Sequence, residues 1–365
     1  MTELTATAAS QSVGSSKLNR VPLSTYRLQL NAGCNLDKVF ELLPHLNQLG
    51  ISDLYLSPLF RAREESSHGY DVVDHGAIDP AIGNMESFER LAEEARAAGM
   101  GILLDVVPNH MGINDPGNAW WLDVLENGEG AYFAGFFDID WRPAASALQD
   151  KILLPFLGEP FGKVLENGEL RVIYDDRRFQ LCYGPRRYPI APPTWTTILE
   201  LALVHGNSDD NGRDTDDWTE LESIIAQLRN LPPASRRDAA AMDERYREQN
   251  VVRRRLSDLL ESSQSVRGAL EKALVQVNGE VGNPKSFDQL EKLLEAQWYR
   301  LAFWRVAADE INYRRFFDIN ELAAVRVEEP RVFDAVHRLV AHFLRQGWVT
   351  GLRTDHPDGL RDPQT

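Results

Sequence analysis

The sequence is poor in cysteine, in long apolar runs and in positive charge. Of its 365 residues only two, Cys34 and Cys182, are cysteines. They lack metal-ligand spacing and could form at most one disulfide. This excludes a disulfide framework and favours a reducing compartment, so the expected location is the cytoplasm.

No stretch of the sequence carries the roughly 20 apolar residues that a membrane-spanning helix needs. Residues 1–20 are rich in Ser, Thr and Ala and lack an apolar core, so they are expected to form a disordered tail rather than a signal peptide. With 39 Lys and Arg against 55 Asp and Glu, the formal net charge is -16. Neither nucleic acid nor an anionic membrane is therefore expected as a partner, whereas a neutral small molecule is compatible with this charge.

What the sequence does contain is a repeated order of strand, amphipathic helix, glycine and strand. Strands are expected at about residues 23–30, 51–57, 101–107 and 348–355. Helices are expected at residues 36–50, where Pro44 should introduce a kink or a new turn, at 84–99 and at 331–347. The last helix is expected to bury Phe333, Val336, Val340 and Phe343 on one face. This order predicts an α/β fold of βα units in a parallel sheet.

The pattern changes between Gly112 and about residue 305. Residues 185–195 are expected to form a Pro-rich loop, and residues 205–218 a polar, mobile loop. One or two charged helices are expected over residues 236–277, and another amphipathic helix over residues 286–306. Residues 113–305 are therefore interpreted as a large, mainly helical insertion, not as a separate globular domain.

Polar side chains follow three of the expected strands. "HGYDVVDH" (68–75) follows the second strand, "DVVPNH" (105–110) runs off the third, and "GLRTDHPD" (351–358) runs off the fourth. In parallel βα folds, working residues lie at the carboxyl ends of strands. Arg353 and Asp355 alternate along a strand, so both side chains are expected on one face. An arginine beside a carboxylate favours the ionised form that a nucleophile requires.

Each of these side chains also has a purely structural interpretation. Asp105 could cap a helix, the polar residues of 68–75 could be ordinary loop residues, and Arg353 with Asp355 could be a structural ion pair. Their convergence on one edge of the sheet favours a site. A Tyr ring suits the apolar face of a sugar, and Asp, Asn and His suit its hydroxyls.

These segments resemble conserved regions of the α-amylase superfamily, which implies a TIM (β/α)8 barrel. "DVVPNH" resembles the first region, "GLRTDHPD" resembles the G-x-R-x-D region that carries the nucleophile, and "HGYDVVDH" resembles the loop whose Tyr stacks on the sugar in subsite −1. Together with "INYRRFFDINELAAVRVE" (311–328), they are similar to the maltooligosyltrehalose synthases. The resemblance runs from about Pro22 to the end of the sequence.

The resemblance implies a role for each candidate residue. Asp355 would be the nucleophile, Arg353 its electrostatic partner and Tyr70 the stacking residue. Six further residues would shape or bind subsite −1, namely His68, Asp71, Asp105, Asn109, His110 and His356. No cofactor is implied, and no metal is assigned, although the Asn of the first region ligates calcium in some amylases.

The implied reaction converts the reducing-end α-1,4 linkage of a maltooligosaccharide into an α,α-1,1 linkage, as in trehalose biosynthesis, and implies functional pairing with a trehalohydrolase. A carboxylate attacks C1, a carboxylic acid protonates the departing oxygen, and a glycosyl-enzyme forms. The released glucose then reorients and attacks. Water must be excluded meanwhile, so the insertion is expected to act as a lid. If deletion of residues 206–217 leaves the ratio of isomerisation to hydrolysis unchanged, that loop has no part in the exclusion.

A second carboxylate is missing from the candidate set. The superfamily carries its acid, a Glu, on the fifth barrel strand and a stabilising Asp near the seventh, whereas only four barrel strands are expected here, over residues 21–112 and 306–365. The chain is therefore expected to be the first part of a longer protein, and to be poorly soluble and inactive alone. In-frame coding DNA beyond Thr365 should encode the missing Glu.

Three alternatives stay open. The first is another α-glucan hydrolase or transglycosylase of the superfamily, and the second is an inactive glycan-binding fragment. The third is a metal-dependent hydrolase on the same barrel, although the sequence lacks H-x-H and H-E-x-x-H spacings. Its ligands would come from His68, His75, His110 and His356, with Asp105 or Asp355.

Overall fold

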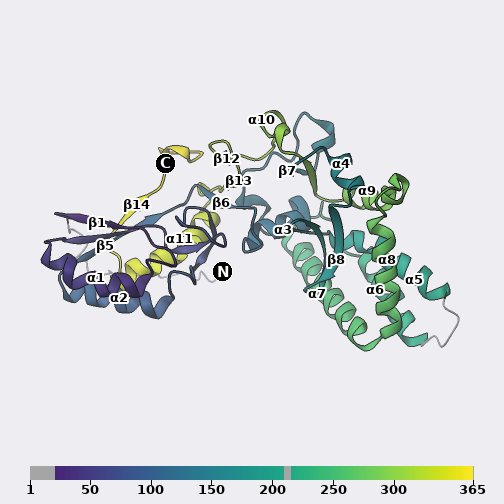
Figure 1. Cartoon of the computed structure of the whole chain (residues 1–365), viewed down its shortest axis with the longest axis horizontal. Helices are drawn as coiled ribbons and strands as arrows, with labels where there is room; N and C mark the ends of the chain where they lie inside the picture. Colours follow the sequence, from purple (N-terminus) through teal and green to yellow (C-terminus); the bar gives the residue numbers. More distant parts are fainter. Residues whose placement is uncertain (1–20, 209–214, 365) are drawn as a thin grey trace, which may run out of the picture.

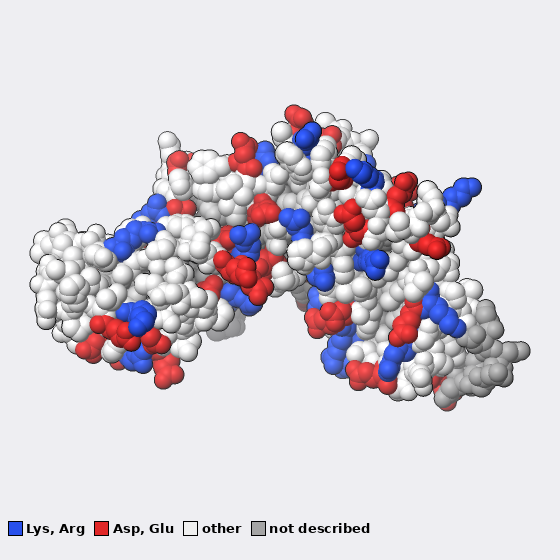
Figure 2. All heavy atoms as spheres, in the orientation of Figure 1, with Lys and Arg blue, Asp and Glu red and all other residues white. Residues whose placement is uncertain are grey.

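The computed structural model describes residues 21–208 and 215–364, and in it the chain forms two lobes (Figure 1). The tail expected over residues 1–20 lies outside the described residues, as does the segment 209–214 of the expected polar loop. Acidic and basic side chains are interspersed over the visible face of both lobes (Figure 2). Among the described residues, no helix is long and apolar enough to cross a membrane.

The first lobe is built on a parallel sheet of four strands in the order β1-β2-β5-β14. Its strands are β1 (Thr25–Leu28), β2 (Asp53–Leu56), β5 (Gly101–Val106) and β14 (Gly351–Thr354). The register aligns Arg27 with Tyr55, and Arg353 with Asp105. All four expected strands and their parallel order are thus confirmed, although β14 comes from the far end of the sequence.

Three helices lie against one face of this sheet (Figure 1), namely α1 (Leu36–Gln48), α2 (Met85–Ala97) and α11 (Pro330–Gln346). The side chain of Asn35 caps α1, and Asn84 caps α2 through a reciprocal box with Ser87. The helix α1 runs through Pro44 without a break, so no new helix begins there. Leucines of β2 and β5 pack with these helices in one apolar core.

The buried face of α11 differs from the expectation by one residue. Val332, Val336, Val340 and Phe343 are buried, whereas Phe333 is 51% exposed. The Phe333 ring stacks on His337 at the surface, with ring centroids 4.2 Å apart. Val332 and Phe333 both fit a helical pattern of apolar residues. The orientation of α11 on the sheet buries Val332 and leaves Phe333 exposed.

The second lobe, mostly within residues 113–305, mixes helices with strands around a second apolar cluster, which extends to β13 (Ile319–Ala324) and to Val332 and Val336 of α11. Its helices are α3 (Ala119–Asn127), α4 (Phe161–Glu166), α5 (Trp195–Ser208), α6 (Thr215–Arg229), α7 (Ala239–Ser262), α8 (Gln264–Asn278) and α9 (Asp288–Glu295). An antiparallel sheet has the order β10-β9-β8, with β8 (Leu170–Asp175), β9 (Arg178–Tyr183) and β10 (Arg186–Pro189). Helices therefore predominate in this segment, as expected, but strands that were not expected accompany them.

Two segments of the second lobe also differ from their expected structure. Residues 185–195 contain β10 and the start of α5 instead of a loop, because β10 is an edge strand, where a proline such as Pro189 is tolerated. Residues 286–306 contain α9 followed by β11 (Tyr299–Phe303), which pairs in parallel with β7 (Ile152–Leu157). Of the one or two helices expected over residues 236–277, the structure has two, α7 and α8.

Short strands connect the two lobes. The strand β6 (His110–Gly112) pairs with β13 (Ile319–Ala324), which pairs with β12 (Arg315–Phe316), and all three lie between the lobes (Figure 1). A second short ladder joins β3 (Phe60–Ala62) to β4 (Val72–Ile78), and α10 (Ala307–Glu310) precedes β12. The segment 311–328 is thereby placed beside "DVVPNH".

Candidate active site

Asp105, at the carboxyl end of β5, is the centre of the polar cluster at this edge of the sheet. Its side chain is fully buried. One carboxylate oxygen accepts a hydrogen bond of 2.9 Å from Nη1 of Arg353. The other accepts from the hydroxyls of Tyr70, at 2.7 Å, and Tyr55, at 2.9 Å. These three hydrogen bonds fix the orientation of the Asp105 carboxylate.

Asp355 directly follows β14 and shares the same guanidinium. Its Oδ1 lies 2.5 Å from Nη1 of Arg353, and its side chain is only 6% exposed. The backbone N–H of Asp355 donates to the carbonyl of Val106, which extends the strand pairing by one residue. Burial lowers the pKa of Arg353, but its hydrogen bonds to Asp105 and Asp355 outweigh this effect and raise it. The expected common face of Arg353 and Asp355 is confirmed.

Two residues of this cluster, Arg27 and Tyr55, were missed in the sequence. Nη2 of Arg27 lies 3.1 Å from the Tyr70 hydroxyl, and its guanidinium lies over the Tyr55 ring, 5.5 Å from the centroid. Burial and the hydrogen bond to Asp105 raise the pKa of Tyr70 to about 12, although Arg27 opposes this shift. Tyr70 is therefore a neutral donor at physiological pH. In the sequence, Arg27 and Tyr55 could have been recognised as candidate site residues because each is a polar side chain within an expected, mainly apolar strand.

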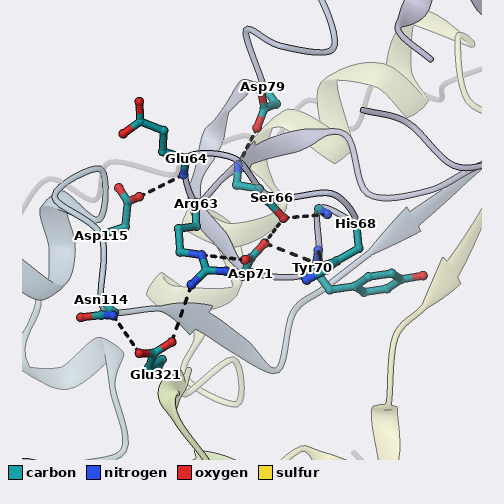
Figure 3. A network of polar contacts seen from close by, with 12 residues as sticks. Arg63, Glu64, Ser66, His68, Tyr70, Asp71, Asp79, Asn114, Asp115 and Glu321 are labelled. Carbon is teal, nitrogen blue, oxygen red and sulfur yellow. Dashed lines mark hydrogen bonds and ion pairs between the residues drawn. The ribbon is translucent and has the colours of Figure 1, made fainter. Parts of the chain in front are cut away.

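The loop that carries Tyr70 is braced by Asp71 and His68 (Figure 3). Asp71 accepts a hydrogen bond of 2.5 Å from the Ser66 hydroxyl and forms an ion pair with Nε of Arg63 at 3.3 Å. Nδ1 of His68 accepts from the backbone N–H of Tyr70 at 3.0 Å and lies 3.8 Å from Asp71. Both residues thus fix the conformation of the loop around Tyr70.

Asn109 and His110 connect "DVVPNH" to the loop and to the β12–β13 hairpin. His110 Nε2 lies 3.1 Å from the Tyr70 carbonyl, and its ring stacks on Phe316 with centroids 4.0 Å apart. Burial lowers the pKa of His110 to about 4, so its ring is neutral. Asn109 Oδ1 accepts from Arg314 Nη1 at 3.2 Å. Arg314 and Phe316 were quoted in a motif but not assigned to the site.

His356 directly follows Asp355 and is partly exposed. Its side chain is 43% exposed, and its backbone adopts a left-handed conformation with φ of 42°. Its ring meets the edges of Phe316 and Phe317, with centroids 5.2 and 5.4 Å apart. The hairpin therefore places two aromatic rings beside the residue that follows Asp355.

A hollow of about 380 Å³ opens between the Tyr70 loop and the hairpin. It is lined by four expected residues, namely His68, Tyr70, Asp71 and His110, together with Phe316 and Glu321 of the hairpin. Aromatic rings with carboxylates and a histidine can bind the apolar and hydroxyl faces of a sugar. All nine expected site residues thus lie in one connected set of contacts around this hollow and Asp105.

His75, a ligand in the metal-hydrolase alternative, is not among the residues that line the hollow beside Tyr70. It is buried beside Phe60 and Trp120, with ring centroids 6.0 and 6.2 Å away. Burial lowers its pKa to about 3. In the described part of the chain, no group of three or more His, Cys, Asp or Glu side chains is placed to hold a metal ion. The histidine set of that alternative is therefore not assembled.

The two buried histidines predict acid sensitivity. Their folded-state pKa values, about 3 for His75 and about 4 for His110, lie below the 6.5 of the unfolded chain. The folded state binds fewer protons, so their stabilisation is complete above about pH 6.5 and is lost as the pH falls toward these values. The substitution His75→Leu removes the contribution of His75 to this pH dependence. When the pH is lowered from 7 to 4.5, the free energy of unfolding of His75→Leu should therefore change in the variant's favour by about 2 kcal/mol relative to that of the wild type.

Denaturant unfolding at both pH values checks this expectation. His45→Leu, at an exposed position on α1, is the matched control and should show the same pH dependence as the wild type. Equal pH dependence of His75→Leu and the wild type would contradict the shifted pKa of His75.

Comparisons with known proteins find relatives among α-amylase-type enzymes, one of which matches along most of the chain. A family model, Alpha amylase, catalytic domain, matches residues 20–145. A Mycobacterium tuberculosis protein, provisionally named a maltooligosyl trehalose synthase, is 31% identical over 93% of this chain and 32% of its own length. An intracellular maltogenic amylase of Bacillus subtilis is 35% identical over 33% of this chain and 19% of its own length.

Solved structures agree with these sequence matches. The maltooligosyltrehalose synthase of Arthrobacter ramosus superposes with a TM-score of 0.62 at 34% identity, covering 94% of this chain and 32% of that protein. Another maltooligosyl trehalose synthase structure gives a TM-score of 0.63 at 28% identity, covering 94% of this chain and 33% of that protein. The chain spans about a third of the length of these relatives.

Proposed function

We propose that this chain carries the nucleophile of an intramolecular transglucosylase. The chain belongs to the α-amylase superfamily and is a homologue of the maltooligosyltrehalose synthases. The reaction would convert the reducing-end α-1,4 linkage of a maltooligosaccharide into an α,α-1,1 linkage. The observation that carries the proposal is the buried Asp355, held by Arg353 beside Asp105 and Tyr70.

Asp355 would attack C1 of the glucosyl unit next to the reducing end. Arg353 would orient this carboxylate, because its Nη1 lies only 2.5 Å from Oδ1 of Asp355. Asp105 would shape subsite −1 by accepting hydrogen bonds from Arg353 and Tyr70 and so holding both side chains beside the sugar. The Tyr70 ring would stack on the apolar face of the sugar in subsite −1.

The general acid must be another group. Retaining enzymes place it about 5 to 5.5 Å from the nucleophile, and it must be protonated when the bond breaks. Asp105 does not suit this role, because its two oxygens accept from Arg353, Tyr55 and Tyr70. We propose that the four strands are the first half of a (β/α)8 barrel, whose next strand supplies a Glu.

The second lobe would act as a lid within this proposal. Residues 113–305 separate barrel segments 21–112 and 306–365, and the lobe joins the site edge through β6 and β13. Exclusion of water would let the released glucose turn and attack the glycosyl-enzyme with its anomeric hydroxyl. Cytoplasmic location and functional pairing with a trehalohydrolase belong to the same proposal and rest on cysteine usage and on the proposed product.

Product analysis tests this function. With maltopentaose, the enzyme should remove reducing ends while releasing little free glucose, because the terminal glucose is retained in an α,α-1,1 linkage. The chain alone is expected to be inactive and poorly soluble, because it supplies no general acid, so the same analysis should be made on a polypeptide completed to the length of the related synthases. A net increase in reducing ends would instead identify a hydrolase, and turnover by the chain alone would refute the need for a further acid.

A further inference from the structure

The second lobe contains a polar cleft of about 400 Å³ that the proposed reaction does not use. It lies between α3, α7 and the outer face of the sheet β8–β10. The helix α3 contributes Asp123 and Glu126, spaced by one turn, and α7 contributes Tyr246 and Arg253, spaced by two turns. The strand β9 contributes Arg178. The size of the cleft falls within the range of small-molecule sites.

Several buried polar atoms of this cleft have no partner among the described residues. They are Oε1 of Glu126, Nε of Arg178 and Nε of Arg253. The other oxygen of Glu126 forms an ion pair with Nη2 of Arg253 at 2.7 Å. Because an unpaired buried donor or acceptor is costly, donors and acceptors arranged in this way fit a ligand that offers both.

The charge of the cleft favours a neutral ligand. Its arginines, at positions 178, 187 and 253, are matched by Asp123, Glu126 and Asp176. Asp123 is held by the Tyr246 hydroxyl at 2.5 Å, which leaves the Tyr246 ring as part of the wall. Apolar side chains, including Leu122, complete the lining. A pyranose is recognised by hydrogen-bond donors and acceptors for its hydroxyls, placed beside apolar surface for the faces of its ring.

The cleft neighbours the candidate active site through an intervening hollow that shares lining residues with both. A hollow of about 690 Å³ shares Leu122 and Arg187 with the cleft. The same hollow shares Arg63 and Asn114 with the hollow beside Tyr70. Three depressions therefore follow one another from the first lobe into the second.

We propose that this cleft is a second carbohydrate site, which binds glucosyl units of an α-glucan away from Asp355. The identity of the sugar rests on the proposed function, whereas the existence of the site rests on the cleft itself. Glucosyl units held there would anchor the part of the chain distant from the reacting linkage and bring the second lobe into substrate binding.

Calorimetric titration of the protein with maltose tests this site. Arg178→Gln should weaken maltose binding about tenfold, because a charged hydrogen-bond donor is lost. The control is Arg171→Gln, on the same face of the sheet but outside the lining of the cleft, which should bind as the wild type does. A second variant, Ala119→Trp, fills the cleft from an exposed position and should have the same effect as Arg178→Gln. Thermal unfolding verifies that each variant is folded.

Tyr70→Ala distinguishes the two sites. If Tyr70→Ala abolishes maltose binding while Arg178→Gln and Ala119→Trp leave it unchanged, the second site is overturned and the proposed function stands. If the cleft variants weaken binding and Tyr70→Ala does not, the second site is supported and the proposed active site is not. Folded protein that binds no maltose would overturn both.

Discussion

Asp355→Asn should lower kcat for maltooligosaccharide conversion by at least about 10³-fold, with little change in KM. The amide keeps the shape of the carboxylate and can still accept a hydrogen bond from Arg353, but it cannot form the glycosyl-enzyme. Steady-state kinetics of the active polypeptide, followed by loss of reducing ends, provides the measurement.

A nearby carboxylate provides the matched control. Asp358 lies three residues further along, and its side chain is 86% exposed. Its carboxylate lies 3.7 Å from Nδ1 of the candidate residue His356, but because it is exposed to solvent, Asp358→Asn should retain kcat within a factor of about two. If folded Asp355→Asn keeps a tenth or more of the wild-type kcat, Asp355 is not the nucleophile.

Arg353→Met should lower both stability and activity. Its removal leaves the buried carboxylates of Asp105 and Asp355 without their shared counter-charge. Breaking a fully buried pair costs about 3 to 5 kcal/mol, and because Arg353 is 42% exposed we expect about 3 kcal/mol at neutral pH. Activity should fall by at least about 100-fold, because the nucleophile loses its orientation. Denaturant unfolding and kinetics measure the two effects.

Two further variants separate this effect from a general loss of charge. Arg361 is 53% exposed, and its carboxylate partners, Asp138 and Glu328, lie 3.7 Å away. Arg361→Met should therefore change the free energy of unfolding by less than about 1 kcal/mol. Adding Asp105→Asn to Arg353→Met should restore part of the lost stability by removing one buried charge. If Arg353→Met is as stable as Arg361→Met, Arg353 does not compensate the buried carboxylates.

The sequence by itself determined the local elements of the first lobe and most of its site. Apolar periodicity, the caps Asn35 and Asn84 and the glycines at helix ends act within a few residues, so the strands and helices of this lobe could be predicted. The positions of Asp105 and Asp355 follow from the same reasoning, because parallel strands bring their carboxyl ends to one edge.

Only the tertiary structure decided how residues distant in sequence combine. Arg27 and Tyr55 join the site through strand register, and Arg314 and Phe316 join it through the pairing of β13 with β6. Long-range pairing also turned residues 186–189 and 299–303 into strands, although their local composition indicated a loop and a helix. The periodicity of apolar residues indicates whether a side chain is buried. Which residue that side chain contacts depends on how segments far apart in the sequence pair, and no local pattern indicates this pairing.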